Sequence, residues 1–570
     1  MNREELLELI RKETEAFEEE LHLVRIPLTA TYHTALKSQK TPEVYGLLAS
    51  SGYAYHLLEE GEPAGIQRAN RILRLVVSLQ DRDPASETYG IWSYFFEEPL
   101  PEMDCPDWNM ADFHGKRLIL TLIKHGNKLE PEIAESIREA IAHACRAIIR
   151  RNVGPHYTNI AIMGAFVTLV GGELLGQAEF RVYGLARLKR FYDFTFGIGT
   201  FSEYNSPCYT PIAIRELYSI FAYSSQQEAV AYADELMDLA WQMAGEHYHS
   251  GTEEWSGPHS RTYSTLLQPG DRQFLAEALL DETFEFGENI RCPKKHRPLF
   301  ASSGPRSFSE PTLLEEQAGY QVYATLYQNE GVSLGTFSKG VMWNQRRNLL
   351  ALLNVGGKTV YVQLQFLKDG ADFCSAMYAG AQVRTDVVFG FNLLTDNGAW
   401  HSDLDRIDGH FRASDLRIRF TVGGETEELS LPTLEDGNRL ILPLGEETLA
   451  IRPLLTRSDF GEPKIQVSRK QDGGDELHLD YVIYAGEEQE FDFHKVKEAA
   501  WLFQLSIHDG GGRLPEATIS QKGDRVEAAL ETQGECISVS LSVVPSQTLE
   551  HYRSNEVRIP EKQIRLSSVL

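Results

Sequence analysis

The chain has 570 residues, and its 82 acidic side chains outnumber its 55 basic ones, which gives a net charge of −27. Such a charge repels the phosphates of nucleic acids and anionic lipid heads, so we expect neither nucleic acid nor a membrane as a partner. A hydrophobic content of 42% and a charged content of 24% exclude a largely disordered chain, a collagen and a long coiled coil. An acidic surface still permits an anionic substrate, because Arg and His can reverse the field inside a local pocket.

The first twenty residues, MNREELLELIRKETEAFEEE, have helical periodicity and many charges. They lack the apolar core and the small-residue cleavage site of a signal peptide. No stretch approaches the roughly 18 uninterrupted apolar residues of a membrane-spanning helix. The six cysteines include no C-x-x-C pair, which favours reduced thiols over a disulfide framework or a zinc ribbon. We therefore expect a cytoplasmic protein.

The first half of the chain has apolar residues at helical spacing. One stripe consists of Ile133, Ile137, Ile141, Cys145 and Ile148. Further helices are predicted over residues 42–59, 64–80, 118–123, 158–176, 178–194, 209–224, 227–245 and 271–282. So many amphipathic helices can be buried in a solenoid or in a closed ring of helical hairpins, and the absence of a fixed repeat disfavours the solenoid. We expect an (α/α) toroid domain over residues 1–310.

From about residue 318 the pattern changes to short β-rich segments, such as TVYVQLQFL and ELHLDYVIYA. Turn formers separate these segments, as in KDGAD and QDGGDE. We expect a large antiparallel β-sandwich over residues 318–570, joined to the helices by a linker at 294–312. The predicted fold class is therefore α+β multidomain, with a helical toroid followed by a β-sandwich.

Polar residues gather in loops of the helical half. In CPDWNMADFHGKRL (105–118), Asp107 or Asn109 either caps the following helix or, with Asp112, binds substrate. Trp108 either stacks on a sugar or belongs to the core. In the segment that follows Gly154-Pro155, His156 precedes Asn159, which is either a helix cap or a donor to a substrate carboxylate.

The loop GTFSEYNSPCY (199–209) carries more polar and aromatic groups than a connection needs. We expect Glu203, Tyr204 and Asn205 to bind substrate. Pro207 is expected to open the helix that follows, with Tyr209 close behind it.

The Gly-rich segment 244–267 is the richest in functional groups. His247 and His249 have a spacing that can bind zinc, but no third ligand is near, so we expect no metal and no other cofactor. An imidazole acting as general base or acid is favoured instead. The candidate residues of this segment are His249, Glu253, Glu254, Trp255, His259, Arg261 and Tyr263.

The order of the two domains, Asn159 and the motif GTFSEYNSPCY that ends in Tyr209 together resemble the heparinase II/III-type polysaccharide lyases. That family pairs an (α/α) toroid with an antiparallel β-sandwich and cleaves uronate-containing glycans by β-elimination. The resemblance implies that Asn159 binds the uronate carboxylate and that Tyr209 is the catalytic base and acid. It further implies a histidine, for which His259 is the best match and His249 and His401 are alternatives.

The chain departs from the family because the sandwich half lacks the family's histidine-rich signature. Instead it carries segments rich in aromatic and charged side chains around Trp343, Arg346, Arg347 and Trp400. We expect most of these residues to have structural roles. The chemistry of elimination fits the candidate residues. Neutralising a uronate carboxylate stabilises the developing enolate, and a tyrosine can act as base if a cation such as Arg261 lowers its pKa.

The predicted function is thus a lyase that acts on acidic oligosaccharides. One alternative is a glycoside hydrolase on the same helical ring, with Glu203 and one of Asp107, Asp112, Glu253 or Glu254 as its two carboxylates. The other is a non-catalytic carbohydrate-binding protein in which Trp108, Tyr204 and Trp255 stack on sugars. The helical surfaces also suit a homo-oligomer, although no coiled-coil stripe specifies one.

Overall fold

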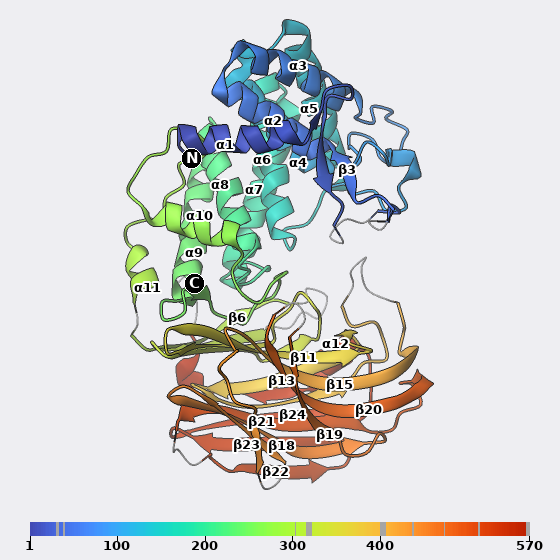
Figure 1. Cartoon of the computed structure of the whole chain (residues 1–570), viewed down its shortest axis with the longest axis vertical. Helices are drawn as coiled ribbons and strands as arrows, with labels where there is room; N and C mark the ends of the chain where they lie inside the picture. The colour runs from blue at the N-terminus through green and yellow to red at the C-terminus, as the bar shows by residue number, and fades with distance from the viewer. Residues whose placement is uncertain are drawn as a thin grey trace. The chain divides into compact units, whose positions relative to one another are not determined.

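The computed structural model describes residues 1–29, 34–37, 40–302, 304–314, 322–399, 406–435, 438–471, 474–510 and 514–565. The chain forms two compact units. Unit 1 comprises Met1–Phe194, Ile212–Leu239 and Ala276–Cys292, and unit 2 comprises Thr195–Pro211, Ala240–Leu275 and Pro293–Leu570. Helices come first along the chain and antiparallel sheets follow (Figure 1), which confirms the predicted α+β class.

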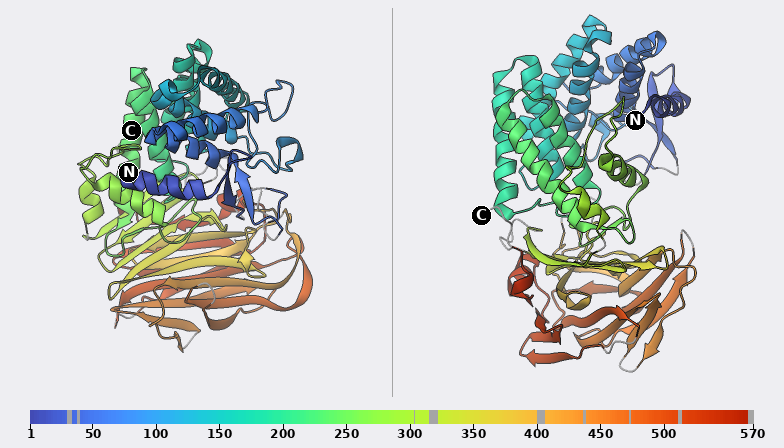
Figure 2. Two further views of the ribbon diagram at one scale, coloured as in Figure 1. Left: turned by 45° about the horizontal axis from the view of Figure 1, so that its top comes forward. Right: turned by 90° about the vertical axis from the view of Figure 1, so that its left-hand side faces the viewer.

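Most of the helices lie in unit 1, and consecutive helices run side by side (Figure 2). They are α1 (Arg3–Glu15), α2 (Leu47–Glu60), α3 (Pro63–Ser78), α4 (Met110–His125), α5 (Pro131–Arg151), α6 (Thr158–Leu175) and α7 (Ala178–Ile198), with short 3₁₀ turns at Leu100–Glu102 and Gly126–Lys128. The last residues of α7 belong to unit 2, and helices α8 (Tyr209–Tyr223), α9 (Gln227–His247) and α10 (Pro269–Leu279) likewise have residues in both units. The predicted stripe on α5 is buried along its whole length, because amphipathic helices hide their apolar face.

Helix α6 is buried almost all round. A side chain at Gly184 of α7 would place its Cβ 2.4 Å from the backbone nitrogen of Leu169, so a glycine there lets α6 and α7 pack closely. In the described part of the chain, α6 is the one helix whose length and composition would allow it to cross a membrane, and 83% of that window is buried inside the protein. A buried core helix of a protein can meet the same criteria of length and composition as a membrane-spanning helix.

The helical prediction for residues 42–59 is wrong in its first turn. Residues Glu43–Gly46 form strand β3, which pairs with β2 (Leu23–Pro27), and β2 pairs with β1 (Phe17–Glu18). Val44 is buried against Leu28 and Phe95. Val44 and Gly46 face inward and Tyr45 is less buried, a short alternation that the stronger helical signal after residue 47 conceals.

Unit 2 is built on three larger antiparallel sheets. One has the strand order β19-β20-β15-β11-β10-β8-β7-β6, with β12 beside β11; the second has the order β16-β17-β18-β21-β14-β13-β9; the third has the order β22-β23-β24-β25. The strands are β6 (Arg306–Thr312), β7 (Val322–Gln328), β8 (Val332–Phe337), β9 (Lys339–Val341), β10 (Leu349–Val355), β11 (Lys358–Lys368), β12 (Ala371–Asp372), β13 (Ala376–Val383), β14 (Asp386–Leu393), β15 (His410–Gly424), β16 (Thr433–Glu435), β17 (Arg439–Leu444), β18 (Glu447–Ser458), β19 (Lys464–Lys470), β20 (Glu476–Asp492), β21 (Ala499–Asp509), β22 (Ala517–Lys522), β23 (Arg525–Thr532), β24 (Glu535–Ser542) and β25 (Glu556–Arg558). Between β24 and β25 lies α12 (Thr548–Ser554), and a 3₁₀ turn follows at Glu561–Gln563.

The three sheets are stacked, with the β21-containing sheet in the middle. One core, with Phe420 and Phe389 among its members, joins it to the β15-containing sheet. A second core, with Val388 and Val539 among its members, joins its other face to the β24-containing sheet. Strands β13 and β14 are therefore buried on both faces, which explains why their sequences do not alternate between apolar and polar residues.

The predicted linker at 294–312 is structured. It contains helix α11 (Arg297–Ala301) and strand β6, which is the edge strand of its sheet. The C-terminal segment lies along β6, since Ile564 and Ser309 form a parallel bridge and the backbone nitrogen of Arg565 donates to the carbonyl of Ser309 (2.7 Å). The outer edge of β6 is thus covered, which limits unwanted pairing with other chains.

Candidate functional site

The predicted site residues fall in both compact units. Trp108, Asp112, His156 and Asn159 belong to unit 1. The other nine belong to unit 2: Glu203, Tyr204, Asn205, Tyr209, His249, Trp255, His259, Arg261 and Tyr263. The alternative histidine, His401, and Trp400 lie outside the described residues.

Asn205 locks the loop before α8 to the segment 255–259. Its side-chain amide donates to the carbonyls of Ser256 (2.8 Å) and Pro258 (2.9 Å), and its Oδ1 accepts from the indole N–H of Trp255 (2.6 Å). Asn205 has a left-handed backbone with φ of 47° and is fully buried. Because these contacts use both ends of the amide, Asn205 and Trp255 hold two loops together.

His259 has a comparable structural contact. Its Nδ1 lies 2.7 Å from the carbonyl of Asn205, so that nitrogen carries the proton and donates. Burial lowers the pKa of His259 to about 3, and the ring is fully enclosed. The imidazole is therefore neutral at physiological pH. The role in catalysis that the resemblance implies for His259 stays a prediction.

The two histidines of the His-x-His pair also contact the protein. His249 lies between Thr252 Oγ1 (2.8 Å from Nδ1) and the carbonyl of Asn329 (2.6 Å from Nε2). His247 Nδ1 lies 2.9 Å from the carbonyl of Met243. Within the described ranges, no group of three His, Cys, Asp or Glu side chains could hold a metal ion.

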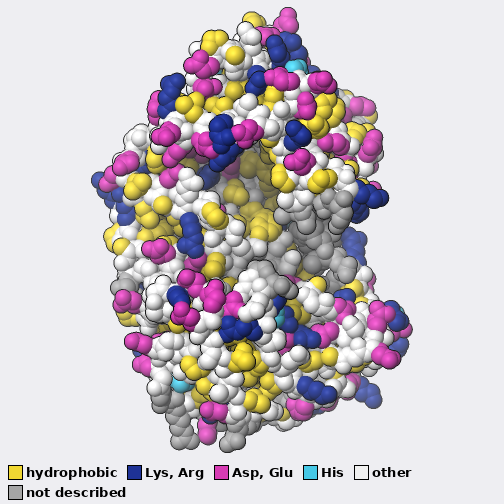
Figure 3. Space-filling view, in the orientation of Figure 1, with side chains coloured by type: hydrophobic (Ala, Val, Ile, Leu, Met, Phe, Trp, Pro, Cys, Tyr) yellow, Lys and Arg dark blue, Asp and Glu magenta, His cyan; other side chains and the backbone are white. Residues whose placement is uncertain are grey.

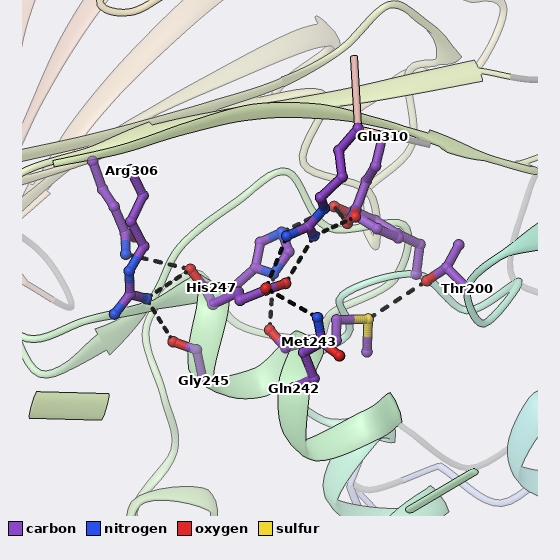
Figure 4. A network of polar contacts seen from close by, with 11 residues as sticks. Thr200, Gln242, Met243, Gly245, His247, Arg306 and Glu310 are labelled. Carbon is purple, nitrogen blue, oxygen red and sulfur yellow. Dashed lines mark hydrogen bonds and ion pairs between the residues drawn. The ribbon is translucent and has the colours of Figure 1, made fainter. Parts of the chain in front are cut away.

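Figure 4 shows a network of polar contacts that includes His247 and Glu310, and the hydroxyl of Tyr204 contacts both of these residues. This hydroxyl donates to Glu310 Oε1 (2.6 Å) and lies 2.9 Å from His247 Nε2. Arg565 binds both oxygens of Glu246 (2.8 Å each) and the free oxygen of Glu310 (2.6 Å). The network connects the loop before α8, the end of α9, strand β6 and the C-terminal segment. It fixes Tyr204, the neighbour of Glu203, in place.

A second group, the Tyr209 cluster, lies at the start of α8 and consists of Glu203, Tyr209, Arg261, Tyr263, Trp343 and Gln345. The hydroxyl of Tyr209 lies 2.5 Å from that of Tyr263. Tyr209 is buried, with 8% of its surface exposed, whereas Tyr263 is 59% exposed. The pair therefore connects an enclosed phenol to an accessible one.

Arg261 is the central cation of the Tyr209 cluster. Its guanidinium lies over the rings of Tyr209 (4.8 Å to the centroid) and Trp343 (5.7 Å). It donates to Glu203 (3.1 Å) and to Gln345 Oε1 (3.0 Å). The backbone places it there, because the carbonyl of Arg261 accepts from Ser206 Oγ, which in turn accepts from the backbone nitrogen of Tyr209. The loop motifs of the sequence do not indicate that Gln345 and Trp343 belong to this cluster. These two residues reach Arg261 because distant segments of the chain pair with each other.

Burial and Arg261 act on Tyr209 in opposite directions. Burial raises the pKa of the Tyr209 phenol, Arg261 lowers it, and the net pKa lies well above the ordinary value of 10. The expected depression by Arg261 is thus present but smaller than the effect of burial. At neutral pH Tyr209 is a phenol, which can donate a proton, and its phenolate form becomes more populated as the pH rises.

The predicted residues of unit 1 lie at the starts of α4 and α6. Asn109 is the cap position of α4, but its side chain accepts from Arg151 (2.6 Å) and donates to Tyr157 (3.3 Å) instead of capping. Asn159 is buried inside the first turn of α6, whose cap position is Tyr157, so the cap reading of Asn159 is wrong. Burial raises the pKa of Asp112 to about 7, against the opposing charge of Arg187.

Three of the carboxylates that a hydrolase could use are bound by neighbouring groups. Glu203 pairs with Arg261, and Glu254 pairs with Arg272 and accepts from the backbone nitrogen of Leu267. Asp107 accepts from the hydroxyl of Tyr94 (2.9 Å) and from the nitrogen of Asn109.

The surface gives little further direction. On the face shown in Figure 3, acidic and basic side chains are intermixed over both parts of the chain. The chain has a net charge of −27. An anion would therefore bind in a local pocket of positive charge and not on this mixed surface.

A family model described as "Domain of unknown function (DUF8769)" matches residues 29–269. The matched span contains every predicted site residue from Trp108 to Tyr263. No curated protein matches the chain. The description names no activity, so the function has to be argued from the geometry of the site.

Proposed function

We propose that the protein is a lyase that cleaves uronate-containing oligosaccharides by β-elimination, with Tyr209 as the base and acid and with α1–α10 arranged as an (α/α) toroid. The observation that carries the proposal is the Tyr209–Tyr263 hydroxyl pair beneath the guanidinium of Arg261. The resemblance to heparinase II/III-type lyases, which singles out Tyr209 and Asn159, supports the same assignment.

The elimination requires removal of the proton next to the sugar carboxylate and protonation of the leaving glycosidic oxygen. Tyr209 in its phenolate form takes the first proton. The new phenol then gives a proton to the leaving oxygen, so the C–O bond breaks as the C=C bond forms. One residue can do both because the two steps occur in sequence on the same face of the sugar.

The phenolate needs support, since burial opposes it. Tyr263 can donate its hydroxyl proton to the phenolate oxygen 2.5 Å away, and Arg261 adds a positive charge over the ring. Because Tyr263 is largely exposed, it also offers a path by which the proton of Tyr209 leaves to solvent. The resemblance assigns the uronate carboxylate to Asn159, which belongs to unit 1, whereas the Tyr209 cluster belongs to unit 2.

Incubation with a panel of uronate glycans tests the proposal. A lyase yields unsaturated products that absorb in the near ultraviolet, in step with new reducing ends. New reducing ends without that absorbance would indicate hydrolysis and contradict the proposal. Binding of the glycans without either product would indicate a carbohydrate-binding protein and would also contradict it.

A further inference from the structure

Residues 343–347 run beside residues 259–262 of unit 2. Arg347 and His259 exchange backbone hydrogen bonds (2.9 and 3.2 Å), and the backbone nitrogen of Thr262 donates to the carbonyl of Gln345 (2.6 Å). The side chain of Gln345 holds Arg261. The same backbone pairing that builds the Tyr209 cluster therefore also fixes the position of Arg347.

The guanidinium of Arg347 is buried without an ionic partner. Only 5% of the residue is exposed. Nη1 donates to the carbonyls of Asn344 (2.6 Å) and Arg346 (3.3 Å), and Nε has no hydrogen-bond partner among the described residues. Burial lowers the pKa of Arg347 to about 10. An enclosed cation of this kind is costly unless something pairs with it.

Three other arginines of unit 2 have carboxylate partners. Arg417 and Arg419 both bind Asp480, and Arg565 binds Glu246 and Glu310. In the described part of the chain Arg347 forms no ion pair with a carboxylate.

Of the groups that face Arg347, the carboxyl of Asp372 is the one that can bring a negative charge, and in the described part of the chain it forms no ion pair with the guanidinium. The hydroxyl of Tyr361 donates to Glu476 (3.2 Å), and Asp372 accepts from Gln365 (3.2 Å) while burial raises the pKa of its carboxyl. The third group, the thiol of Cys208, has a pKa that burial raises, so it is uncharged at neutral pH. Cys208 directly precedes Tyr209, and Gln345, two residues before Arg347, binds Arg261 of the same cluster.

We propose that Arg347 anchors an anionic group, a carboxylate or a sulfate, of an oligosaccharide bound at the Tyr209 cluster. A guanidinium matches either group with two parallel hydrogen bonds, and an enclosed site strengthens them. The anchor rests on the proposed function only for the nature of the ligand; a recessed cation would hold the same anionic group in a protein that binds without cleaving.

Titration calorimetry with a hyaluronan hexasaccharide, its carboxyl-reduced form and inorganic sulfate tests the anchor. All variants carry Tyr209→Phe so that the ligand stays intact. We expect the acidic hexasaccharide to bind at least tenfold more tightly than the reduced one, and Arg347→Gln to abolish this preference. Arg412→Gln, which removes an exposed arginine of the same unit paired with Glu488, serves as the control and keeps it.

The outcomes separate the two proposals. An unchanged preference in Arg347→Gln overturns the anchor, whether or not the wild-type protein is a lyase. Binding of inorganic sulfate alone, with no preference between the two hexasaccharides, overturns it as well. Loss of the preference in Arg347→Gln, in a protein that makes no unsaturated product, supports the anchor while the lyase proposal fails.

Thermal unfolding of Arg347→Met provides a second test. A methionine fills the same space without a charge, and the exposed Asn344 carbonyl can turn to water. If Arg347 is kept for a ligand, the variant unfolds at the wild-type temperature or above it. A drop of several degrees, together with unchanged ligand preference in Arg347→Gln, would show that Arg347 only supports the fold.

Discussion

At the scale of single residues, Tyr209 is governed by two opposed effects. Burial raises the pKa of its phenol, and the guanidinium of Arg261 lowers it without cancelling the effect of burial. The resulting group is a protonated phenol at neutral pH, and its basic phenolate form is scarce. Its use as a base therefore has a clear signature in the pH dependence of the reaction.

We predict that kcat/KM for elimination rises about tenfold for each pH unit through the neutral range, because the phenolate fraction of a group with a raised pKa grows in that way. Arg261→Gln removes the cation that lowers the pKa, so the rise should begin at a higher pH and the rate at pH 8 should fall by about tenfold or more. Initial rates of product absorbance across pH check both points. A rate that falls as the pH rises would mean that Tyr209 does not act as the base.

Asn205 is the residue whose loss should most disturb the site loop. Asn205→Ala removes three buried hydrogen bonds, leaves the indole N–H of Trp255 without its acceptor and puts alanine at a left-handed φ. We expect a loss of about 2–4 kcal/mol, since each buried polar group left unsatisfied costs about 1–3 kcal/mol. Urea unfolding measures this loss in the free energy of unfolding. A variant as stable as the wild type would show that Asn205 does not hold the two loops together.

At the scale of elements, ion pairs and a hydrogen bond join the C-terminal segment to Tyr204 in the loop before α8. Arg565 binds Glu246 at the end of α9 and Glu310 on β6, and Glu310 accepts from Tyr204. Burial acts to raise the pKa of Glu246, but its bonds to Arg565 outweigh burial and the pKa is lowered. A group with a lowered pKa adds stability that is present above its ordinary pKa and is lost as the pH falls through the lowered value.

Arg565→Gln should therefore destabilise the protein at pH 7 and have little effect in acid. We expect a loss of about 1–3 kcal/mol at pH 7, below the full cost of breaking a buried pair because the guanidinium is partly screened by solvent. The difference in unfolding midpoint between variant and wild type should shrink as the pH falls below about 4. An equal difference at both pH values would show that the ion pairs are not its source.

The stripe on α5 was indicated well by the sequence, because an amphipathic helix repeats its apolar residues on one face. Strands β13 and β14 escaped prediction since both of their faces are covered. Strand β6 escaped because its Pro and Ser residues resemble those of a linker, although an edge strand tolerates them.

At the scale of the whole molecule, the sequence indicated the order of helices before sheets and the loops that carry the site. It singled out Tyr209, Arg261 and Tyr263, which the structure brings together. It could not indicate that Gln345 and Trp343 complete the cluster, because their approach depends on the pairing of segments more than 80 residues apart in the chain. Nor could it show that Tyr204 and Asn205 are enclosed by networks of their own.

The central claim is that the Tyr209 hydroxyl performs the proton transfers, and a pair of matched variants tests it most directly. Tyr209→Phe and Tyr263→Phe each remove one hydroxyl from the same 2.5 Å contact, so both disturb the pair equally. The readout is the rate at which unsaturated product absorbs in the near ultraviolet, on a glycan that the wild-type protein cleaves. The account predicts that Tyr209→Phe lowers that rate by at least about a thousandfold, as loss of a proton-transferring group does, while Tyr263→Phe lowers it by about tenfold. Turnover of Tyr209→Phe at or near the wild-type rate, in a folded protein, would contradict it.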